Sequence, residues 1–478
     1  MNDLRPLISL GDIFFAPLCY ILLFIIFRLI IRKYDEEKKG LFIRAFHFRM
    51  FCAVVFAIIV AYYYHGGDSE MYYDATLDMQ KAVLQDNFNI WKILTTFRVD
   101  INHPLAPYFF ADRDKYPVFE FMASSSNYFV PKLALVPSII FFKSYISIGM
   151  LFSFFALGGA IRIYKLFYNY FPKLHKHIAF AFLFLPSVCF WSSGLLKDSI
   201  CFGAVGFLLY GIFSVFIRRK KILSSIIWII IGIILLYYIK VYILLALLPA
   251  ITLWLFGEMN KSVKDPLLRK LWSFFTIATA IILVIVLINY VTSDVNLSTF
   301  RLDNVLETSD YNRELYQSAS SQNEGSYFQI QSGNPVLLIL NGFIAALFRP
   351  FLWEITSPIV ILSALEALLF TLLTGYFFFK KGIIKYFQCA FSGPILILCS
   401  TFAFVFAASV GATATNFGSL SRYKIPCLPF YLFMLFAIYY KSGLQLPRWT
   451  NRIFNLIFRD TTTQSTIIRD KPFDHLSA

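Results

Sequence analysis

The feature that constrains this chain most is a series of apolar runs separated by short segments rich in Lys and Arg. A helix needs about 20 apolar residues to cross the hydrocarbon core of a bilayer, where its backbone must be hydrogen-bonded internally. The 478-residue chain is 58% hydrophobic and 15% charged, with a mean hydropathy of +0.66. We therefore expect an all-α polytopic membrane protein. Its seven cysteines lie in or beside apolar runs without metal-ligand spacing, which indicates small core residues.

The basic segments predict the orientation of the chain. Loops rich in Lys and Arg stay on the cytoplasmic side, so the net charge of +15 does not require a nucleic-acid partner. Segments 32–49, 165–177, 218–221 and 261–270 are then cytoplasmic, with the N-terminus outside and the C-terminus inside. This alternation predicts about eleven crossings, at residues 13–31, 50–64, 145–164, 177–190, 201–216, 222–256 (two, turning at Lys240), 272–290, 358–379, 391–410 and 425–440.

The same topology divides the chain into a membrane domain, residues 1–441, and a basic cytoplasmic tail, residues 442–478. It leaves two long external loops, residues 65–127 and 293–355. In the first loop we expect an amphipathic helix at residues 78–97. Residues 130–142 are apolar but short, which predicts a half-helix or re-entrant segment, and residues 335–355 predict an interfacial or re-entrant element.

Residues 185–200, LPSVCFWSSGLLKDSI, lie between two of the apolar runs and carry the pair Lys197 and Asp198. We interpret this stretch as two membrane helices that meet at a bend near residues 191–194, with the charged pair opening the second helix. Charges at a membrane boundary are costly unless they are paired or face a polar cavity, so they indicate function. In the alternative, Lys197 extends to water and Asp198 favours the positive end of the helix.

Several other charged side chains fall on the external side under this topology. They comprise carboxylates and five cations, at Asp68, Glu70, Lys197, Asp198, Lys240, Arg349, Arg422 and Lys424. Lys and Arg near helix ends bind phosphate oxygens well, and a carboxylate among them could serve as a general base toward a sugar hydroxyl. The alternative for each cation is an ordinary interfacial position with its charge in water.

Asp68 follows Gly66 and Gly67 at the end of the second predicted span. Two glycines allow a sharp turn, which would place Asp68 at the mouth of a cavity, and Tyr72 would share its face of a following helix and could orient it. The alternative is that Asp68 is the N-cap of a helix beginning at Ser69.

Three short motifs resemble those of a known superfamily. Gly67-Asp68-Ser69 with Tyr72 resembles the GxDxxxY-type motif of EpsG-like and Wzy-like membrane glycosyltransferases and polysaccharide polymerases. Lys197-Asp198 resembles a cationic motif at the corresponding place, although Arg is more usual there. Residues 422–426, RYKIP, resemble the RYR-P segment near the end of GT-C glycosyltransferases. In GT-C enzymes the acidic motif usually follows the first span, whereas here it follows the second.

This resemblance implies an enzyme of the bacterial cytoplasmic membrane that assembles cell-envelope or exopolysaccharide. It would transfer a sugar or oligosaccharide from a polyprenyl-linked donor on the periplasmic face, alongside other polysaccharide-assembly proteins. The resemblance implies catalytic roles for Asp68 and Glu70, where a divalent metal could also bind. It implies binding of the lipid (di)phosphate by Lys197, Asp198, Lys240, Arg349, Arg422 and Lys424. The alternatives are a lipid-linked oligosaccharide flippase or transporter, or a non-catalytic membrane scaffold.

Overall fold

The structure is a computed structural model that describes residues 6–64, 66–110, 121–261, single positions between 265 and 282, and residues 335–355, 357–414 and 416–458. These residues form an all-helical protein, as expected. Seven of the described helices are long and apolar enough to cross a membrane, or eight if the bent pair α19–α20 forms one span. Most of the predicted span 272–290 and all of the loop 293–334 lie outside the described residues, so the count of eleven stays a prediction.

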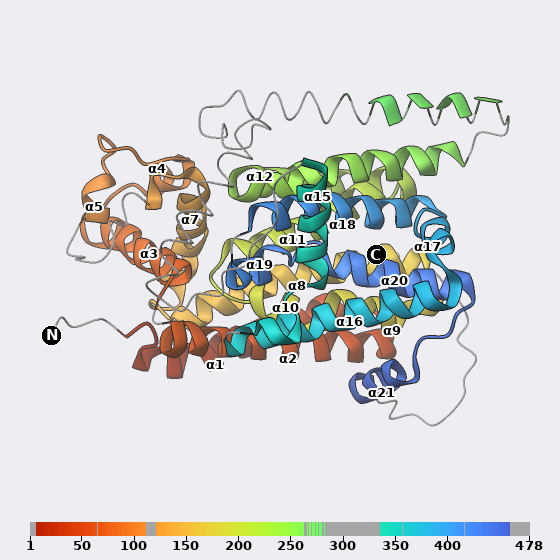
Figure 1. The fold of residues 1–478 in the computed structure, drawn as a ribbon. Coiled ribbons are helices and arrows are strands. Elements are labelled where there is room, and N and C mark those ends of the chain that lie inside the picture. Colours follow the sequence, from red (N-terminus) through yellow and green to blue (C-terminus); the bar gives the residue numbers. More distant parts are fainter. Residues whose placement is uncertain are drawn as a thin grey trace.

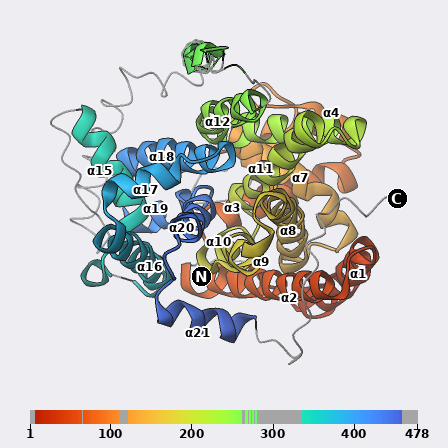
Figure 2. The ribbon, with the colours of Figure 1, turned by 90° about the vertical axis from the view of Figure 1, so that its right-hand side faces the viewer.

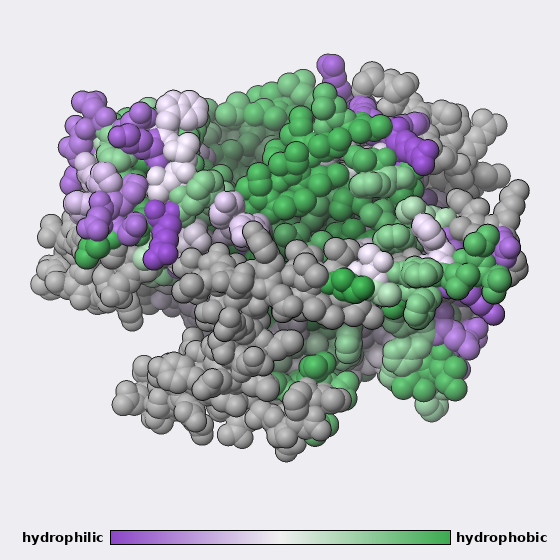
Figure 3. Space-filling model, turned by 90° about the horizontal axis from the view of Figure 1, so that it is seen from above, coloured by the Kyte–Doolittle hydropathy of each residue, from purple (hydrophilic) through white to green (hydrophobic). Residues whose placement is uncertain are grey.

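The helices form a bundle with a smaller lobe at one end. Figure 1 shows helices α3, α4, α5 and α7 gathered in this lobe on the left, whereas α17 and α21 lie at the opposite end. Figure 2 shows the long helices nearly end-on, side by side around the central helices. Figure 3 shows an apolar surface over the middle of the bundle with hydrophilic side chains at both ends. A membrane-embedded bundle has this distribution, because apolar side chains face lipid and polar ones face water.

The first half of the chain follows the expected pattern in part: residues 177–190, expected as one crossing, are divided among α9, η3 and α10 and are not among the candidate spans. Helix α8 crosses the bundle and packs against α11, where Gly159, Gly203 and Gly206 bring the two backbones so close that a Cβ would overlap the facing chain. The helices of this half are α1 (Leu10–Ile31), α2 (Glu36–Ile59, continued by η1, Val60–Tyr64), α3 (Asp68–Gln85), α4 (Ile90–Thr95), α5 (Ala106–Phe110), α7 (Ser125–Ile140), α8 (Tyr145–Tyr170), η2 (Pro172–Leu174), α9 (His175–Ala179), η3 (Phe180–Phe184), α10 (Pro186–Trp191), α11 (Lys197–Ile212) and η4 (Phe213–Arg218).

Two expectations for this half were wrong in their bounds. The amphipathic helix expected at residues 78–97 begins ten residues earlier, at Asp68, and ends at Gln85, where Asn87 has a positive φ of 53°. The basic segment 32–49 is not a loop, because α2 already begins at Glu36. Arg49, which we assigned to the cytoplasmic side, is fully buried inside the bundle instead.

Helix α12 (Ile222–Asn260) is broken at Lys240, whose φ of −148° and ψ of 75° are not helical. Its first half runs along α11 in the opposite direction. A Cβ on Gly211, near the C-terminal end of α11, would contact Ser225 and Ile229. At the other end, Lys240 bonds Asp198 in the first turn of α11.

The second half of α12 returns to the end of the bundle from which the first half started. Trp254 Nε1 donates a hydrogen bond to the Tyr170 hydroxyl, over 3.2 Å, at the C-terminus of α8. The Tyr170 ring lies 6.0 Å from the Phe213 ring, just beyond α11. Each half has about 20 residues and so a length of about 30 Å. The contacts therefore show two antiparallel halves that turn at Lys240, whereas by length and composition α12 counts as one candidate span.

The second half of the chain completes the bundle. Its helices are α15 (Pro335–Phe348), η6 (Leu352–Glu354), α16 (Pro358–Lys381), α17 (Ile383–Ala390), α18 (Pro394–Thr413), α19 (Phe417–Tyr423), α20 (Leu428–Ser442) and α21 (Arg448–Ile457). Helices α19 and α20 bend by 67° at a short break. The RYKIP stretch ends α19 with Arg422 and Tyr423 and continues into this break, and Arg422 contacts Asp198 of α11.

Candidate functional site

Four of the predicted charged residues form one continuous chain of ion pairs at the end of the bundle that carries the α3–α7 lobe. Lys240 Nζ lies 2.5 Å from Asp198 Oδ1, and Arg422 Nε lies 2.7 Å from Asp198 Oδ2. The Arg422 Nη2 atom lies 2.8 Å from Asp68 Oδ2. The four residues come from α12, α11, α19 and α3. Asp68 and Arg422, more than 350 positions apart in sequence, therefore meet in one group of four residues. We call this group the charged cluster.

Each member of the charged cluster is placed by a local break in helical structure. Lys240 lies at the kink of α12, Asp198 lies in the first turn of α11, and Arg422 lies near the end of the short helix α19. Asp68 is the first residue of α3, after Gly66 and Gly67 with φ values of 134° and 91°. Such φ values favour glycine, so the expected sharp turn is confirmed.

The charged cluster has a buried end and an accessible end. The Asp198 and Lys240 side chains are only 2% and 5% exposed, respectively. The Arg422 side chain is 16% exposed and that of Asp68 is 39% exposed. A buried carboxylate between two cations holds both strongly, because removing it would leave charges without compensation. Asp198 is thus the buried carboxylate that binds both cations, and Asp68 is the accessible carboxylate, bound to Arg422.

Asp68 does not act as an N-cap. The N-cap of α3 is Gly67, no side-chain cap hydrogen bond forms there, and Asp68 already has a helical position. The Asp68 carboxylate instead points to Arg422. The structure thus removes the alternative that we left open for this residue, although a carboxylate in the first turn still favours the positive end of the helix.

Lys197 lies beside the charged cluster but is not paired within it. Its Nζ atom donates a hydrogen bond to the Ser126 hydroxyl, over 2.9 Å, at the start of α7. Ser69, next to Asp68, bonds the Leu195 carbonyl over 3.0 Å. The lobe is therefore joined to the turn before α11 at Leu195 and to the start of α11 at Lys197.

Tyr72 is 1% exposed and does not hydrogen-bond Asp68. Its hydroxyl donates to Asn127 Oδ1 over 3.2 Å instead. Burial, followed by the charge of Asp68, raises the pKa of Tyr72 well above its ordinary value, so the phenol stays protonated. Tyr72 thus braces α3 against the start of α7, and it lies near Asp68 without a direct bond to it.

Glu70 folds back over the turn before α3. A Cβ on Gly66 would overlap the Glu70 carboxylate, so the pair Asp68 and Glu70 does not converge on one point. Within the described ranges, no group of three or more His, Cys, Asp or Glu side chains is arranged to hold a metal ion. Because Asp68 is also bonded to Arg422, its surroundings do not fit a divalent metal.

Arg349 and Lys424 form a second group next to the charged cluster. Arg349 pairs with Glu354, and its guanidinium lies 5.2 Å from the centre of the Phe417 ring. Lys424, 1% exposed, donates to the Arg349 carbonyl over 3.0 Å. The five predicted cations therefore do not all share one site: Lys240 and Arg422 are in the cluster, Lys197 borders it, and the other two brace the segment after α15.

The charged residues that sequence reasoning missed hold the short helix α10. Glu366 in α16 accepts a hydrogen bond from the Ser187 backbone N–H over 2.9 Å and another from its hydroxyl, at the start of α10. Arg49 donates to the Ser192 carbonyl over 3.1 Å at its end. A carboxylate at a helix N-terminus and a cation at its C-terminus both oppose the helix dipole. These contacts fix the turn that leads to Lys197 and Asp198.

One of these two residues carried a visible signal in the sequence. Glu366 is a carboxylate inside an apolar run, and an ionisable residue within a span indicates function by default. Arg49 carried no such signal, because it follows other basic residues that the positive-inside rule explains equally well.

Comparisons of the chain with protein-family models, with curated proteins and with solved structures found no match. The fold and the charged cluster therefore define only a structural class. The protein is all-helical over its described residues, suited to a membrane, and has a chain of ion pairs at one end of the bundle.

Proposed function

We propose that this protein is a membrane glycosyltransferase whose donor is a sugar or oligosaccharide linked to a polyprenyl (di)phosphate. It would serve in the assembly of cell-envelope or exopolysaccharide, as a repeat-unit polymerase or a single-sugar transferase of GT-C-like architecture with eleven crossings. It would act in a bacterial cytoplasmic membrane, on the periplasmic face. The observation that carries the proposal is the position of Arg422 between a buried and an exposed carboxylate, with Lys197 beside them.

The geometry supports an exchange of anions at Arg422. Asp198 is buried and also holds Lys240, so it remains bound to Arg422. Asp68 is more exposed, and its ion pair is with Arg422. A phosphate group is a strong partner for a guanidinium, and it would displace the outer carboxylate first. Donor binding would then release Asp68 as a base close to the phosphate.

The proposed reaction needs three events. The freed Asp68 carboxylate takes the proton of an acceptor sugar hydroxyl, and the hydroxyl oxygen forms a bond to the anomeric carbon of the donor. The bond from that carbon to the phosphate oxygen breaks, and the polyprenyl (di)phosphate leaves with the electron pair. Arg422 and Lys197 would stabilise the charge that develops on the leaving group, and the proton on Asp68 then passes to solvent.

Substitution of Asp68 tests this role. Asp68→Asn keeps the size and a hydrogen-bond acceptor for Arg422 but cannot take a proton at neutral pH. We expect it to abolish glycan output from cells that depend on this protein, while the amount of folded protein in the membrane stays normal. Glu70→Gln is the matched control, because Glu70 lies in the same turn but is directed back over Gly66. Full output from Asp68→Asn would overturn the proposal of a carboxylate base.

The cations are tested in the same cells. Arg422→Ala and Lys197→Ala should each lower glycan output about tenfold to a hundredfold, since one charge-assisted contact is worth about 1.5–3 kcal/mol. Arg349→Ala should act more through the amount of folded protein, because Arg349 is bonded to Glu354. Normal output from both Arg422→Ala and Lys197→Ala would remove these residues from the phosphate site.

One observation favours transport of a lipid-linked oligosaccharide as the second candidate. Arg49 and Glu366 place charges inside the bundle, and the Arg49 Nε and Nη2 atoms have no hydrogen-bond partner. Charges at several depths are a feature of transport pathways. The two candidate functions can be distinguished in cells that carry Asp68→Asn, by the membrane leaflet in which lipid-linked oligosaccharide accumulates. A transferase leaves it in the outer leaflet, accessible to impermeant periodate, whereas a flippase leaves it inside.

A further inference from the structure

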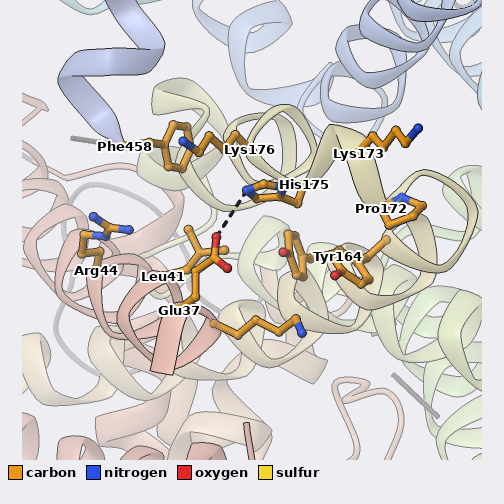
Figure 4. Close-up of a pocket in the computed structure, with 11 residues that line it drawn as sticks. Glu37, Leu41, Arg44, Tyr164, Pro172, Lys173, His175, Lys176 and Phe458 are labelled. Carbon is orange, nitrogen blue, oxygen red and sulfur yellow. Dashed lines mark ion pairs between the residues drawn. The ribbon is translucent and has the colours of Figure 1, made fainter. Parts of the chain in front are cut away.

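A cavity of about 330 Å³ lies at the end of the bundle opposite the charged cluster. Its wall is built by one face of α2 (Glu37, Leu41 and Arg44), by Tyr164 and Tyr168 of α8, by the η2–α9 segment and by Phe458 after α21. Figure 4 shows Arg44 on one side of it and Lys173 on the other, with the ion pair of Glu37 and His175 between them. The volume is in the range of small-molecule sites.

The lining of this cavity is strongly basic. Four Lys or Arg residues (Lys38, Arg44, Lys173 and Lys176) face a single carboxylate, Glu37. Glu37 Oε1 lies 3.5 Å from His175 Nε2, and Lys38 also bonds Asp35 outside the cavity. Among the residues that line the cavity, positive charges outnumber negative ones. A concave basic surface raises the local concentration of anions.

The walls are held in place by buried aromatic contacts, so the cavity is part of the fold. The Tyr164 ring meets the Phe42 ring edge-on at 5.6 Å, and Tyr164 is 1% exposed. On the far wall, the Phe454 ring lies 4.5 Å from the His177 ring and 6.0 Å from that of Phe458. These contacts fix the segment after α21 against α9 and close one side of the cavity.

The position of the cavity sets the kind of ligand. It lies at the start of α2 and the end of α8, two helices long and apolar enough to span a membrane. Its lining combines cations and tyrosine hydroxyls with apolar side chains at Leu41, Pro172 and Phe458. A phosphate group with a glyceryl or acyl portion attached matches this mixture, because the cations bind the phosphate oxygens and the apolar wall contacts the carbon chain.

We propose that this cavity is a binding site for a phosphate group, supplied by the headgroup of an anionic phospholipid at the membrane surface. The site is separate from the charged cluster, and it does not depend on the glycosyltransferase proposal. A lipid bound in this site would contact α2, α9 and Phe458, which follows α21, and would so hold α21 against the bundle.

Native mass spectrometry of the full-length protein released from nanodiscs tests the site. Nanodiscs of phosphatidylcholine are compared with mixtures that contain phosphatidylglycerol. We expect the wild type to retain phosphatidylglycerol preferentially, and Arg44→Gln with Lys176→Gln to lower that retention about tenfold. The matched control removes the exposed pair Lys380 and Lys381 at the end of α16, and should retain lipid as the wild type does. Equal loss in the pocket variant and the control would overturn the proposal.

Two further measurements keep the result interpretable. Excess glycerol 3-phosphate or inorganic phosphate in the release buffer should compete only weakly, and complete displacement by inorganic phosphate would assign the site to a free anion rather than to a lipid. Arg44→Lys retains the charge and should retain the lipid, with the same elution profile and melting temperature as the wild type. Loss of lipid from a well-folded Arg44→Lys would overturn recognition by charge, and equal retention of both lipids by the wild type would overturn the site itself.

Discussion

The substitution Asp198→Asn is the sharpest test of the charged cluster. The Asp198 carboxylate is 2% exposed and bonds Lys240 over 2.5 Å and Arg422 over 2.7 Å. Asparagine has nearly the same size and keeps one oxygen, so the change removes a charge without opening a cavity. Lys240, 5% exposed, then loses the carboxylate with which it forms its ion pair, and Arg422 keeps the outer carboxylate of Asp68.

The expected loss follows from burial. Removing one partner of a buried ion pair costs about 3–5 kcal/mol, because the remaining charge stays buried without compensation. Asp68→Asn removes the other carboxylate bonded to Arg422, but that side chain is 39% exposed, and an exposed pair contributes about 1 kcal/mol or less. Two substitutions of the same chemistry on the same arginine should therefore differ by at least about 2 kcal/mol in unfolding free energy.

The assay is thermal unfolding of the purified protein in one detergent, followed by tryptophan fluorescence for the wild type and both variants. A third variant combines Asp198→Asn with Lys240→Met, because replacing both partners of a buried pair by uncharged groups is often nearly neutral. We expect this double variant to recover at least half of the loss. A melting temperature of Asp198→Asn equal to that of Asp68→Asn, or a double variant less stable than Asp198→Asn alone, would refute the reasoning.

Three further predictions concern other parts of the chain. Cysteines introduced in residues 65–127 or 293–334 should react with an impermeant maleimide from outside, and those in residues 441–478 only from inside; the opposite result would reverse the proposed topology. Burial lowers the pKa of Lys132 in the lobe from 10.5 to about 8. The unfolded chain then binds more protons between these values, so the stability of wild type relative to Lys132→Met should rise with pH from about 8 to 10, and a flat difference between the two melting curves would contradict this. Glu366→Leu should lower the unfolding free energy by about 1–3 kcal/mol, since the buried Ser187 N–H loses its acceptor, with a smaller loss in Glu366→Gln.

The apolar runs predicted most of the membrane helices because the bilayer imposes a length and a composition on any segment that crosses it. Helices α1, α8 and α16 begin or end within a few residues of their predicted bounds. Breaks in the helices were also visible: Gly66 and Gly67 before α3, and Lys240 within an apolar run. In each case a residue that disfavours a continuous apolar helix marks the position.

Local sequence did not determine which helix faces lay inward. Nothing near Arg49 in the sequence shows its burial, and the apolar run around Glu366 does not show which helix its carboxylate faces. Both side chains are fixed by contacts to the α10 region more than a hundred residues away. The positive-inside rule assigned Arg49, with the rest of segment 32–49, to the cytoplasmic side, because that rule counts charges and contains no information on packing. Helix α17, Ile383–Ala390, follows only Gly382 after the long helix α16 and was not predicted.

The candidate site divides in the same way. The sequence by itself determined that certain charged residues would lie at ends or breaks of membrane helices, because a charge inside an apolar span is costly. These residues are Asp68, Lys197, Asp198, Lys240 and Arg422. Only the tertiary structure decided which of them are partners. Arg422 could have bonded any carboxylate at that end; the bend between α19 and α20 and the kink of α12 bring it and Lys240 to the same buried aspartate. Pairing depends on distances across the bundle, which no local pattern encodes.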